Sequence, residues 1–89
     1  MSAAPDIVMY STTWCPYCDR ARALLQRKGL PFREIKVDED PAARAAMLAR
    51  SGGGRTVPQI FVGDHHVGGF DDLYALDKAG KLDALTGRA

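Results

Sequence analysis

The sequence has few cysteines, no excess of either charge and no long apolar segment, and each absence excludes a class of protein. Only two cysteines occur among 89 residues, so no framework of disulfides stabilises the fold. Lys and Arg total 12 and Asp and Glu total 11, and the net charge of +1 argues against a strongly basic nucleic-acid-binding protein. No apolar run approaches the roughly 20 residues that cross a bilayer. We therefore expect neither nucleic acid nor membrane among its partners.

The composition is that of a small folded domain. Hydrophobic residues make up 46% of the chain and charged residues 26%, which is ordinary for globular proteins. A chain of this length forms one domain, to which we assign residues 1–89. Met1–Asp6 lacks the charged and apolar regions of a secretory signal, which favours a cytoplasmic protein. Because no large exposed apolar patch is indicated, we also expect a monomer.

Hydrophobic periodicity and turn residues predict alternating strands and helices. We expect strands at residues 7–10, 32–37, 59–62 and 65–68, and helices at 16–28, 41–50, 71–78 and 81–85. The first strand–helix–strand unit requires a parallel pair of strands, and the hairpin turn at Gly63-Asp64 requires an antiparallel pair. The fold class is therefore α/β, with a mixed sheet of about four strands and helices packed on it.

The same periodicity predicts which residues face the core. The expected buried residues are Ala21, Leu24 and Leu25 in the first helix, and Ala45, Leu48 and Ala49 in the second. In the second strand, Ile35 and Val37 share one face.

The motif Cys15-Pro16-Tyr17-Cys18 stands where the first strand passes into the first helix. Unpaired N–H groups and the helix dipole stabilise a thiolate at a helix N-terminus, and the pKa of such a cysteine can fall from roughly 8.5 to between about 3.5 and 7.5. Cys15 lies just before the first turn, and Cys18 lies one turn into the helix. We therefore expect Cys15 to attack as the nucleophile and Cys18 to resolve the resulting mixed disulfide.

Two other interpretations of the cysteines carry less weight. Structural cysteines would more often be scattered along the chain. A structural zinc site needs four ligands, and the adjacent His65 and His66 point to opposite faces of a strand, so they do not readily meet one metal. A Cys-x-x-Cys pair in a small βαβ chain is mostly a redox dithiol, and we expect no metal.

Two further motifs stand beside strands. Thr56-Val57-Pro58 opens the third strand, and composition alone predicts a trans Val57–Pro58 bond because only about 5–6% of such bonds are cis. Gly68-Gly69-Phe70-Asp71-Asp72 joins the last strand to a helix. Its glycines permit close approach of the backbone, and the helix N–H groups suit a carboxylate. Asp71 or Asp72 would cap that helix or hold an ammonium group, and the sequence leaves both roles open.

In this order and spacing, the three motifs, the second of them continued by Gln59-Ile60-Phe61, resemble those of glutaredoxins. The resemblance covers residues 7 to about 85 and is greatest for the short dithiol bacterial glutaredoxins, particularly the glutaredoxin 3 type. It implies a thioredoxin-like fold and glutathione as co-substrate. It also implies a cis bond before Pro58, contrary to the expectation from composition.

The resemblance further implies a binding site for glutathione beside Cys15. The backbone of Val57 would pair with the cysteine unit of glutathione, and the turn at Gly69, Phe70 and Asp71 would hold the γ-glutamyl end, with Asp72 near its amine. Arg44 matches the position that helps to hold the glycyl carboxylate. The residues implied to bind glutathione are Tyr17, Arg44, Thr56, Val57, Pro58, Gly69, Phe70, Asp71 and Asp72.

The chain departs from the family pattern at three places. Thr12 stands where many relatives carry Lys, so the carboxylate would rest more on Arg44. The segment Ser51–Arg55 is one residue longer than in close relatives, and Arg55 would partly replace the missing Lys. Phe70 replaces a residue that is often Cys, which removes a third oxidisable thiol.

These observations predict a glutathione-dependent thiol–disulfide oxidoreductase. Its substrates would be protein disulfides and mixed disulfides between glutathione and proteins. One alternative is a carrier in which two chains bridge an iron–sulfur cluster through Cys15 and two glutathiones, although Pro16 argues against it because cluster-holding relatives usually have a small residue there. Another alternative keeps the dithiol but receives its electrons from thioredoxin reductase.

Overall fold

The computed structural model describes residues 6–87, so Met1–Pro5, on which the expectation of a cytoplasmic location largely rests, lies outside the described residues. The elements are β1 (Ile7–Ser11), α1 (Pro16–Arg27), β2 (Arg33–Lys36), α2 (Pro41–Arg50), β3 (Gln59–Val62), β4 (His65–Gly68), α3 (Phe70–Lys78) and α4 (Lys81–Leu85). Every predicted strand and helix is present, and no boundary moves by more than one residue. Within residues 6–87, no helix is both long enough and apolar enough to cross a membrane.

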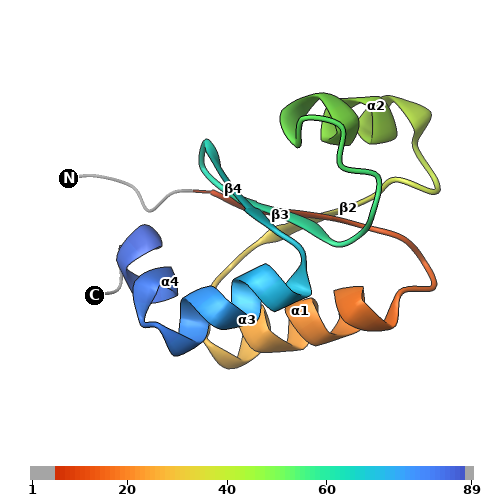
Figure 1. Cartoon of the computed structure of the whole chain (residues 1–89). Helices are drawn as coiled ribbons and strands as arrows, with labels where there is room; N and C mark the ends of the chain where they lie inside the picture. Colours follow the sequence, from red (N-terminus) through yellow and green to blue (C-terminus); the bar gives the residue numbers. More distant parts are fainter. Residues whose placement is uncertain (1–5, 88–89) are drawn as a thin grey trace.

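The four strands form one mixed sheet in the order β2-β1-β3-β4. β1 runs parallel to β2 and antiparallel to β3, and β3 runs antiparallel to β4. Figure 1 shows α1, α3 and α4 on one side of the sheet and α2 on the other. The predicted α/β architecture is therefore confirmed.

The central position of β1 in the sheet explains why its residues are apolar except for Ser11. All five of its residues are buried, as expected for a strand covered on both faces. Ile7 and Met9 belong to the core cluster that includes residues of α1, α3 and α4. Val8 and Tyr10 belong to a second cluster, which includes Met47 of α2. The core is thus divided by the sheet into two layers.

The predicted buried face of α2 is wrong. Ala45 and Ala49 are exposed and Leu48 is only partly buried, whereas Met47 is fully buried, with Ala43 packed against the same cluster. In an Ala-rich helix several faces are similarly apolar, so periodicity alone does not choose between the face with Met47 and the face with Leu48.

The predicted buried face of α1 is confirmed, since Ala21, Leu24 and Leu25 lie in the core. Lys28, at the end of this helix, forms ion pairs of 2.8 Å with Asp77 and 2.9 Å with Asp83. These acceptors raise the pKa of Lys28. The C-terminal end of α1 is thereby tied to both α3 and α4. Ile35 of β2 and Val37, which directly follows this strand, belong to the α2-side cluster, as expected.

Candidate active site

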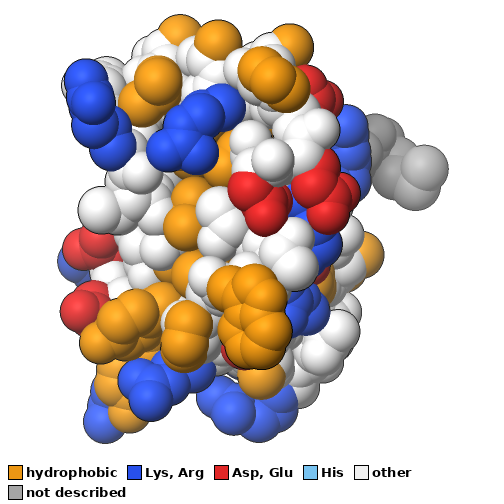
Figure 2. Space-filling model, turned by 90° about the vertical axis from the view of Figure 1, so that its right-hand side faces the viewer, with side chains coloured by type: hydrophobic (Ala, Val, Ile, Leu, Met, Phe, Trp, Pro, Cys, Tyr) orange, Lys and Arg blue, Asp and Glu red, His pale blue; other side chains and the backbone are white. Residues whose placement is uncertain are grey.

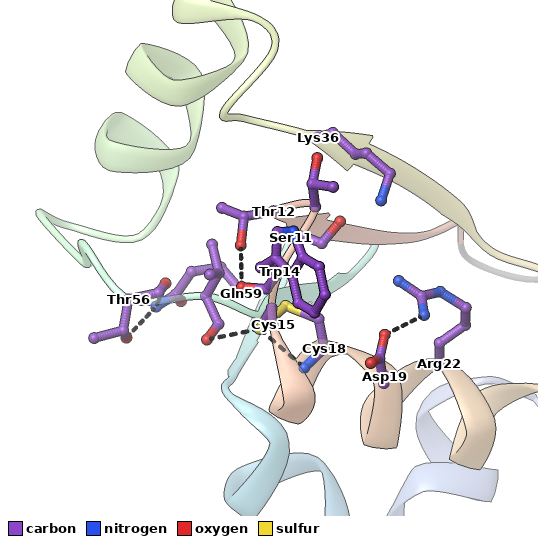
Figure 3. Close-up of a disulfide and its surroundings, with 12 residues drawn as sticks. Ser11, Thr12, Trp14, Cys15, Cys18, Asp19, Arg22, Lys36, Thr56 and Gln59 are labelled. Atoms are coloured by element: carbon purple, nitrogen blue, oxygen red, sulfur yellow. Dashed lines mark hydrogen bonds and ion pairs between the residues drawn. A yellow bond between two sulfur atoms is a disulfide. The ribbon is translucent and has the colours of Figure 1, made fainter.

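Cys15 and Cys18 are joined by a disulfide at the N-terminus of α1, with their Cα atoms 5.1 Å apart (Figure 3). Helix α1 begins here because Pro16 occupies its first position, where the missing N–H costs no hydrogen bond. Cys15 is extended, with φ −155°, and serves as the N-cap. The chain therefore turns from β1 into α1 directly at the disulfide.

The two sulfurs have different surroundings. The Cys15 sulfur accepts a hydrogen bond of 3.0 Å from the backbone N–H of Cys18. Cys15 is 9% exposed and Cys18 is 0% exposed. A thiolate at the Cys15 position would accept the hydrogen bond from that N–H, and the positive end of the helix dipole would stabilise its negative charge. Of the two cysteines, Cys15 is the one that an incoming sulfur can reach.

The loop before β3 lies against the disulfide. The Val57–Pro58 bond is cis, so the expectation from the resemblance is confirmed and the trans bond expected from composition is wrong. The trans preference of such a bond is only about 0.5–1 kcal/mol, so tertiary contacts decide the isomer. The Val57 carbonyl oxygen lies 3.7 Å from the Cys15 sulfur, close enough to accept a hydrogen bond from the reduced thiol.

A groove of about 420 Å³ is lined by eight of the predicted glutathione-site residues and three others. It is formed by Tyr17, Thr56, Val57, Pro58, Gly69, Phe70, Asp71 and Asp72, together with Gln59, His66 and Gly68. Eight of the nine predicted residues are therefore brought together. Arg44 is not among the lining residues and lies exposed on α2.

Gln59, His66 and Gly68 were not predicted as site residues, although Gln59 and Gly68 stand in the segments that carry the resemblance. The alternation along β3 and β4 could have placed Gln59 and His66 beside the groove only if the register of the hairpin had been known.

Close backbone approach shapes the end of the groove near α3. Gly68 has φ +114°, and a side chain there would collide with the Asp72 carboxylate. That carboxylate accepts a hydrogen bond of 3.2 Å from the Gly69 N–H, so Asp72 caps α3. The capping role left open by the sequence is thus present. N–H groups in the first turn of a helix have no partner within it and suit a carboxylate.

Aromatic rings line the outer side of the groove. The Tyr17 and Phe70 rings lie 6.3 Å apart, and the Phe70 and Tyr74 rings lie 5.9 Å apart. The Arg20 guanidinium sits 5.3 Å from the centre of the Tyr17 ring. Trp14, next to the disulfide, is 92% exposed. Figure 2 shows one face with hydrophobic side chains gathered on its lower part and basic side chains around them.

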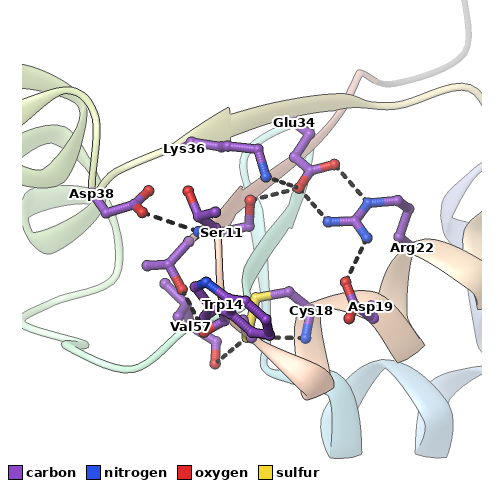
Figure 4. Close-up of polar contacts among 12 residues, drawn as sticks. Ser11, Trp14, Cys18, Asp19, Arg22, Glu34, Lys36, Asp38 and Val57 are labelled. Atoms are coloured by element: carbon purple, nitrogen blue, oxygen red, sulfur yellow. Dashed lines mark hydrogen bonds and ion pairs between the residues drawn. A yellow bond between two sulfur atoms is a disulfide. The ribbon is translucent and has the colours of Figure 1, made fainter.

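A polar network follows the disulfide along α1 (Figure 4). Arg22 donates to the Glu34 carboxylate at 2.8 Å and to Asp19 at 2.7 Å. The buried Ser11 hydroxyl donates to the same Glu34 carboxylate at 2.6 Å. Mainly because of the Arg22 hydrogen bond, the pKa of Glu34 falls to about 2. This network ties α1 to β1 and β2, and it was not predicted from the sequence.

Metal ligands do not gather in the described part of the chain. No group of three or more His, Cys, Asp or Glu side chains there could hold a metal ion. His66 instead lies 2.6 Å from the Gln59 carboxamide oxygen.

The chain is similar to glutaredoxins in sequence. The family model described as Glutaredoxin matches residues 7–67. A glutaredoxin of Pseudomonas aeruginosa is 62% identical over 81 residues, which cover 91% of this chain and 95% of that protein. Glutaredoxin 3 of Escherichia coli K12 is 51% identical over 80 residues, which cover 90% of this chain and 95% of that protein. The resemblance seen in the motifs is confirmed.

Similarity extends to solved structures. The crystal structure of a buckwheat glutaredoxin–glutathione complex matches with a TM-score of 0.83 and 34% identity, covering 93% of this chain and 77% of that one. The fold is thioredoxin-like, as the resemblance implied.

Proposed function

This chain belongs to the glutaredoxin family and is a glutathione-dependent thiol–disulfide oxidoreductase, and we propose that Cys15 and Cys18 carry its reaction. The observation that supports this assignment most directly is the position of Cys15, which caps α1 beside a groove and accepts the Cys18 N–H. The comparisons do not favour a cluster carrier or a thioredoxin-reductase-fed redoxin.

In the monothiol reaction, the Cys15 thiolate attacks the glutathione sulfur of a protein–glutathione mixed disulfide. The protein thiolate leaves and takes up a proton, and Cys15 now carries glutathione. The thiolate of a second glutathione attacks the glutathionyl sulfur on Cys15. Glutathione disulfide leaves, and the Cys15 thiolate is regenerated.

In the dithiol reaction, the Cys15 thiolate attacks a protein disulfide and forms a mixed disulfide with one of its sulfurs. The Cys18 thiolate then attacks the Cys15 sulfur, which releases the reduced protein and forms the Cys15–Cys18 disulfide present in the structure. Two glutathione molecules reduce this disulfide in turn and leave as glutathione disulfide. Cys18 lies in the same chain with its Cα atom 5.1 Å from that of Cys15, so its attack on Cys15 is intramolecular.

The groove is the proposed site for the glutathionyl group. Support comes from the eight predicted residues that line it and from the glutathione bound in the buckwheat protein. Within the groove, the Val57 backbone would hold the cysteine unit. The start of α3 would hold the γ-glutamyl carboxylate, with Asp72 near the amine. Arg44 remains the proposed partner of the glycyl carboxylate, from outside the groove.

The proposal includes further properties of the protein. Its partners are glutathione and disulfide-containing or glutathionylated proteins, and it acts as a cytoplasmic monomer without a metal cofactor. Family membership supports the glutathione requirement.

The test is glutathione-dependent reduction of a glutathionylated peptide, coupled to glutathione reductase, with Cys15→Ser and Cys18→Ser alongside wild type. We expect no activity in Cys15→Ser and retained activity in Cys18→Ser, because the monothiol reaction needs only Cys15. Retained activity in Cys15→Ser would contradict the assignment of the nucleophile. Wild-type turnover with thioredoxin reductase but not with glutathione would contradict the proposed function.

A further inference from the structure

A buried carboxamide forms part of the wall of the groove. Gln59, on β3, is only 5% exposed. Its Nε2 group donates to the Thr56 carbonyl oxygen at 2.9 Å and lies 3.3 Å from the Thr56 hydroxyl (Figure 3). Its Oε1 atom lies 2.6 Å from Nε2 of His66. All three residues line the groove.

Hydrogen-bond chemistry determines the direction of this chain of contacts. The Thr56 carbonyl oxygen only accepts, so the NH₂ group of Gln59 must face it. The Gln59 oxygen therefore faces His66 and needs a donor. His66 must then carry a proton on Nε2, which holds for one neutral tautomer and for the protonated ring. The chain of donors thus runs from His66 to Gln59 to Thr56.

Strand pairing and stacking hold the His66 ring in place. His66 is the partner of Phe61 across the β3–β4 pair. The two rings stack with their centres 4.7 Å apart and an angle of 21° between their planes. Phe61 is itself buried, and the Arg50 guanidinium lies 4.1 Å from the centre of its ring. His66 is exposed, and its stacked ring presents the donor to Gln59.

The series of hydrogen bonds from His66 to Thr56 ends next to the residue that contacts the Cys15 sulfur. Thr56 directly precedes Val57, whose carbonyl oxygen is 3.7 Å from the Cys15 sulfur. The loop around Gly54 also packs closely against Gln59, since a side chain at position 54 would lie 3.0 Å from the Gln59 nitrogen. We propose that His66 is a positioning residue, which acts through Gln59 to set the Thr56–Val57 backbone that receives the glutathionyl group. This inference rests on the proposed function.

The first experiment separates KM from kcat for a glutathionylated peptide. His66→Phe keeps a ring to stack on Phe61 but removes the donor. We expect KM to rise about fivefold, the worth of one ordinary hydrogen bond, with kcat changed by less than about twofold. His66→Gln supplies an N–H at similar reach and should restore KM to within about twofold of wild type. His65→Phe, one residue away and outside the groove, is the matched control and should leave KM unchanged.

A double-mutant cycle tests whether His66 acts through Gln59. In a Gln59→Leu background, His66→Phe should raise KM no further, because the acceptor of its hydrogen bond is gone. A second full fivefold rise would overturn the inference. An unchanged KM in His66→Phe would also overturn it, as would a fall in kcat alone.

A spectroscopic measurement on the wild-type protein tests the protonation of His66 without any substitution. At a pH where His66 is neutral, the imidazole nitrogen signals of the wild-type protein should show the proton on Nε2. A proton on Nδ1 would overturn the inference even if every variant failed to fold. The two proposals fail differently. Wild type without glutathione-dependent turnover contradicts the proposed function, whereas active wild type with an unaltered KM in His66→Phe contradicts only the positioning role.

Discussion

Single residues at the site matter as much for the space they leave as for the groups they carry. Gly68 leaves room for the Asp72 carboxylate. A side chain in place of Gly69 would lie 3.6 Å from the Pro58 carbonyl oxygen. The two backbone segments that line the groove therefore approach each other closely. The spacing of Cys15 and Cys18 in the sequence predicts their role. The close approach of the two backbone segments cannot be predicted in this way, because it depends on where the segments meet in the fold.

Gly68→Ala should destabilise the fold and weaken binding of the glutathionylated peptide. Its methyl group would meet the Asp72 carboxylate at a backbone with φ +114°, in a region that disfavours L side chains. We expect a loss of about 1–3 kcal/mol in the free energy of unfolding and a raised KM. Urea unfolding and peptide kinetics measure both. Gly53→Ala, with φ +99° but nothing within 4 Å, should lose less stability and keep its KM; equal losses would contradict the collision.

Glu34→Gln should remove a pH-dependent part of the stability. The pKa of Glu34 is about 2 in the folded protein, against 4.5 for an ordinary Glu. Since folding favours the ionised form, its contribution is complete above about pH 5 and declines as the pH falls from 4.5 towards 2. The stability difference between wild type and Glu34→Gln should shrink over that range in urea titrations. Asp19→Asn, which alters the more exposed partner of Arg22, is the control and should show a weaker pH dependence.

At the scale of elements, α2 shows where periodicity misleads. Ala residues at many positions make several of its faces similarly apolar, and the face predicted from periodicity is not the buried one. The observed face has Met47 in the core. At its end, Arg50 donates to the Tyr10 hydroxyl at 3.3 Å and to the Gly63 carbonyl at 3.2 Å. The orientation of α2 therefore depends on partners in β1 and in the turn after β3.

Met47→Ala should destabilise the protein far more than Leu48→Ala. Met47 is fully buried against the α2 side of the sheet, and truncation would leave a cavity there. The expected loss is about 2–5 kcal/mol in the free energy of unfolding, measured by urea denaturation. Leu48, on the neighbouring face, is only partly buried. A larger loss in Leu48→Ala would mean that the originally predicted face is the buried one.

At the scale of the whole molecule, the site forms where distant segments meet. The start of α1, the Thr56–Pro58 loop and the start of α3 are far apart in the chain, and the sheet brings them to one end. On the helical layer, Lys28 joins α1 to α3 and α4 through Asp77 and Asp83. These ion pairs connect helices that also share one core cluster.

Lys28→Met should lower the melting temperature at neutral pH. The aspartates raise the pKa of Lys28 above its usual 10.5, so the contribution of its charge is present at neutral pH and is lost only when the pH rises above that value. Salt should therefore lower the melting temperature of wild type more than that of the variant. Arg27→Met, at an exposed neighbouring position, is the control. Equal melting temperatures in wild type and Lys28→Met would contradict the role of these ion pairs.

The sequence by itself determined the order and type of every element and the position of the dithiol, because periodicity, Pro and Gly punctuation and the Cys15–Cys18 spacing act over a few residues. Tertiary structure decided the cis bond before Pro58, the burial of Met47 and the His66–Gln59–Thr56 chain. The cis bond and the burial of Met47 depend on contacts between segments distant in the sequence, whereas the His66–Gln59–Thr56 chain depends on the register of the β3–β4 hairpin. Local preference at such positions is worth too little to choose between the alternatives, so the packed neighbours make the choice.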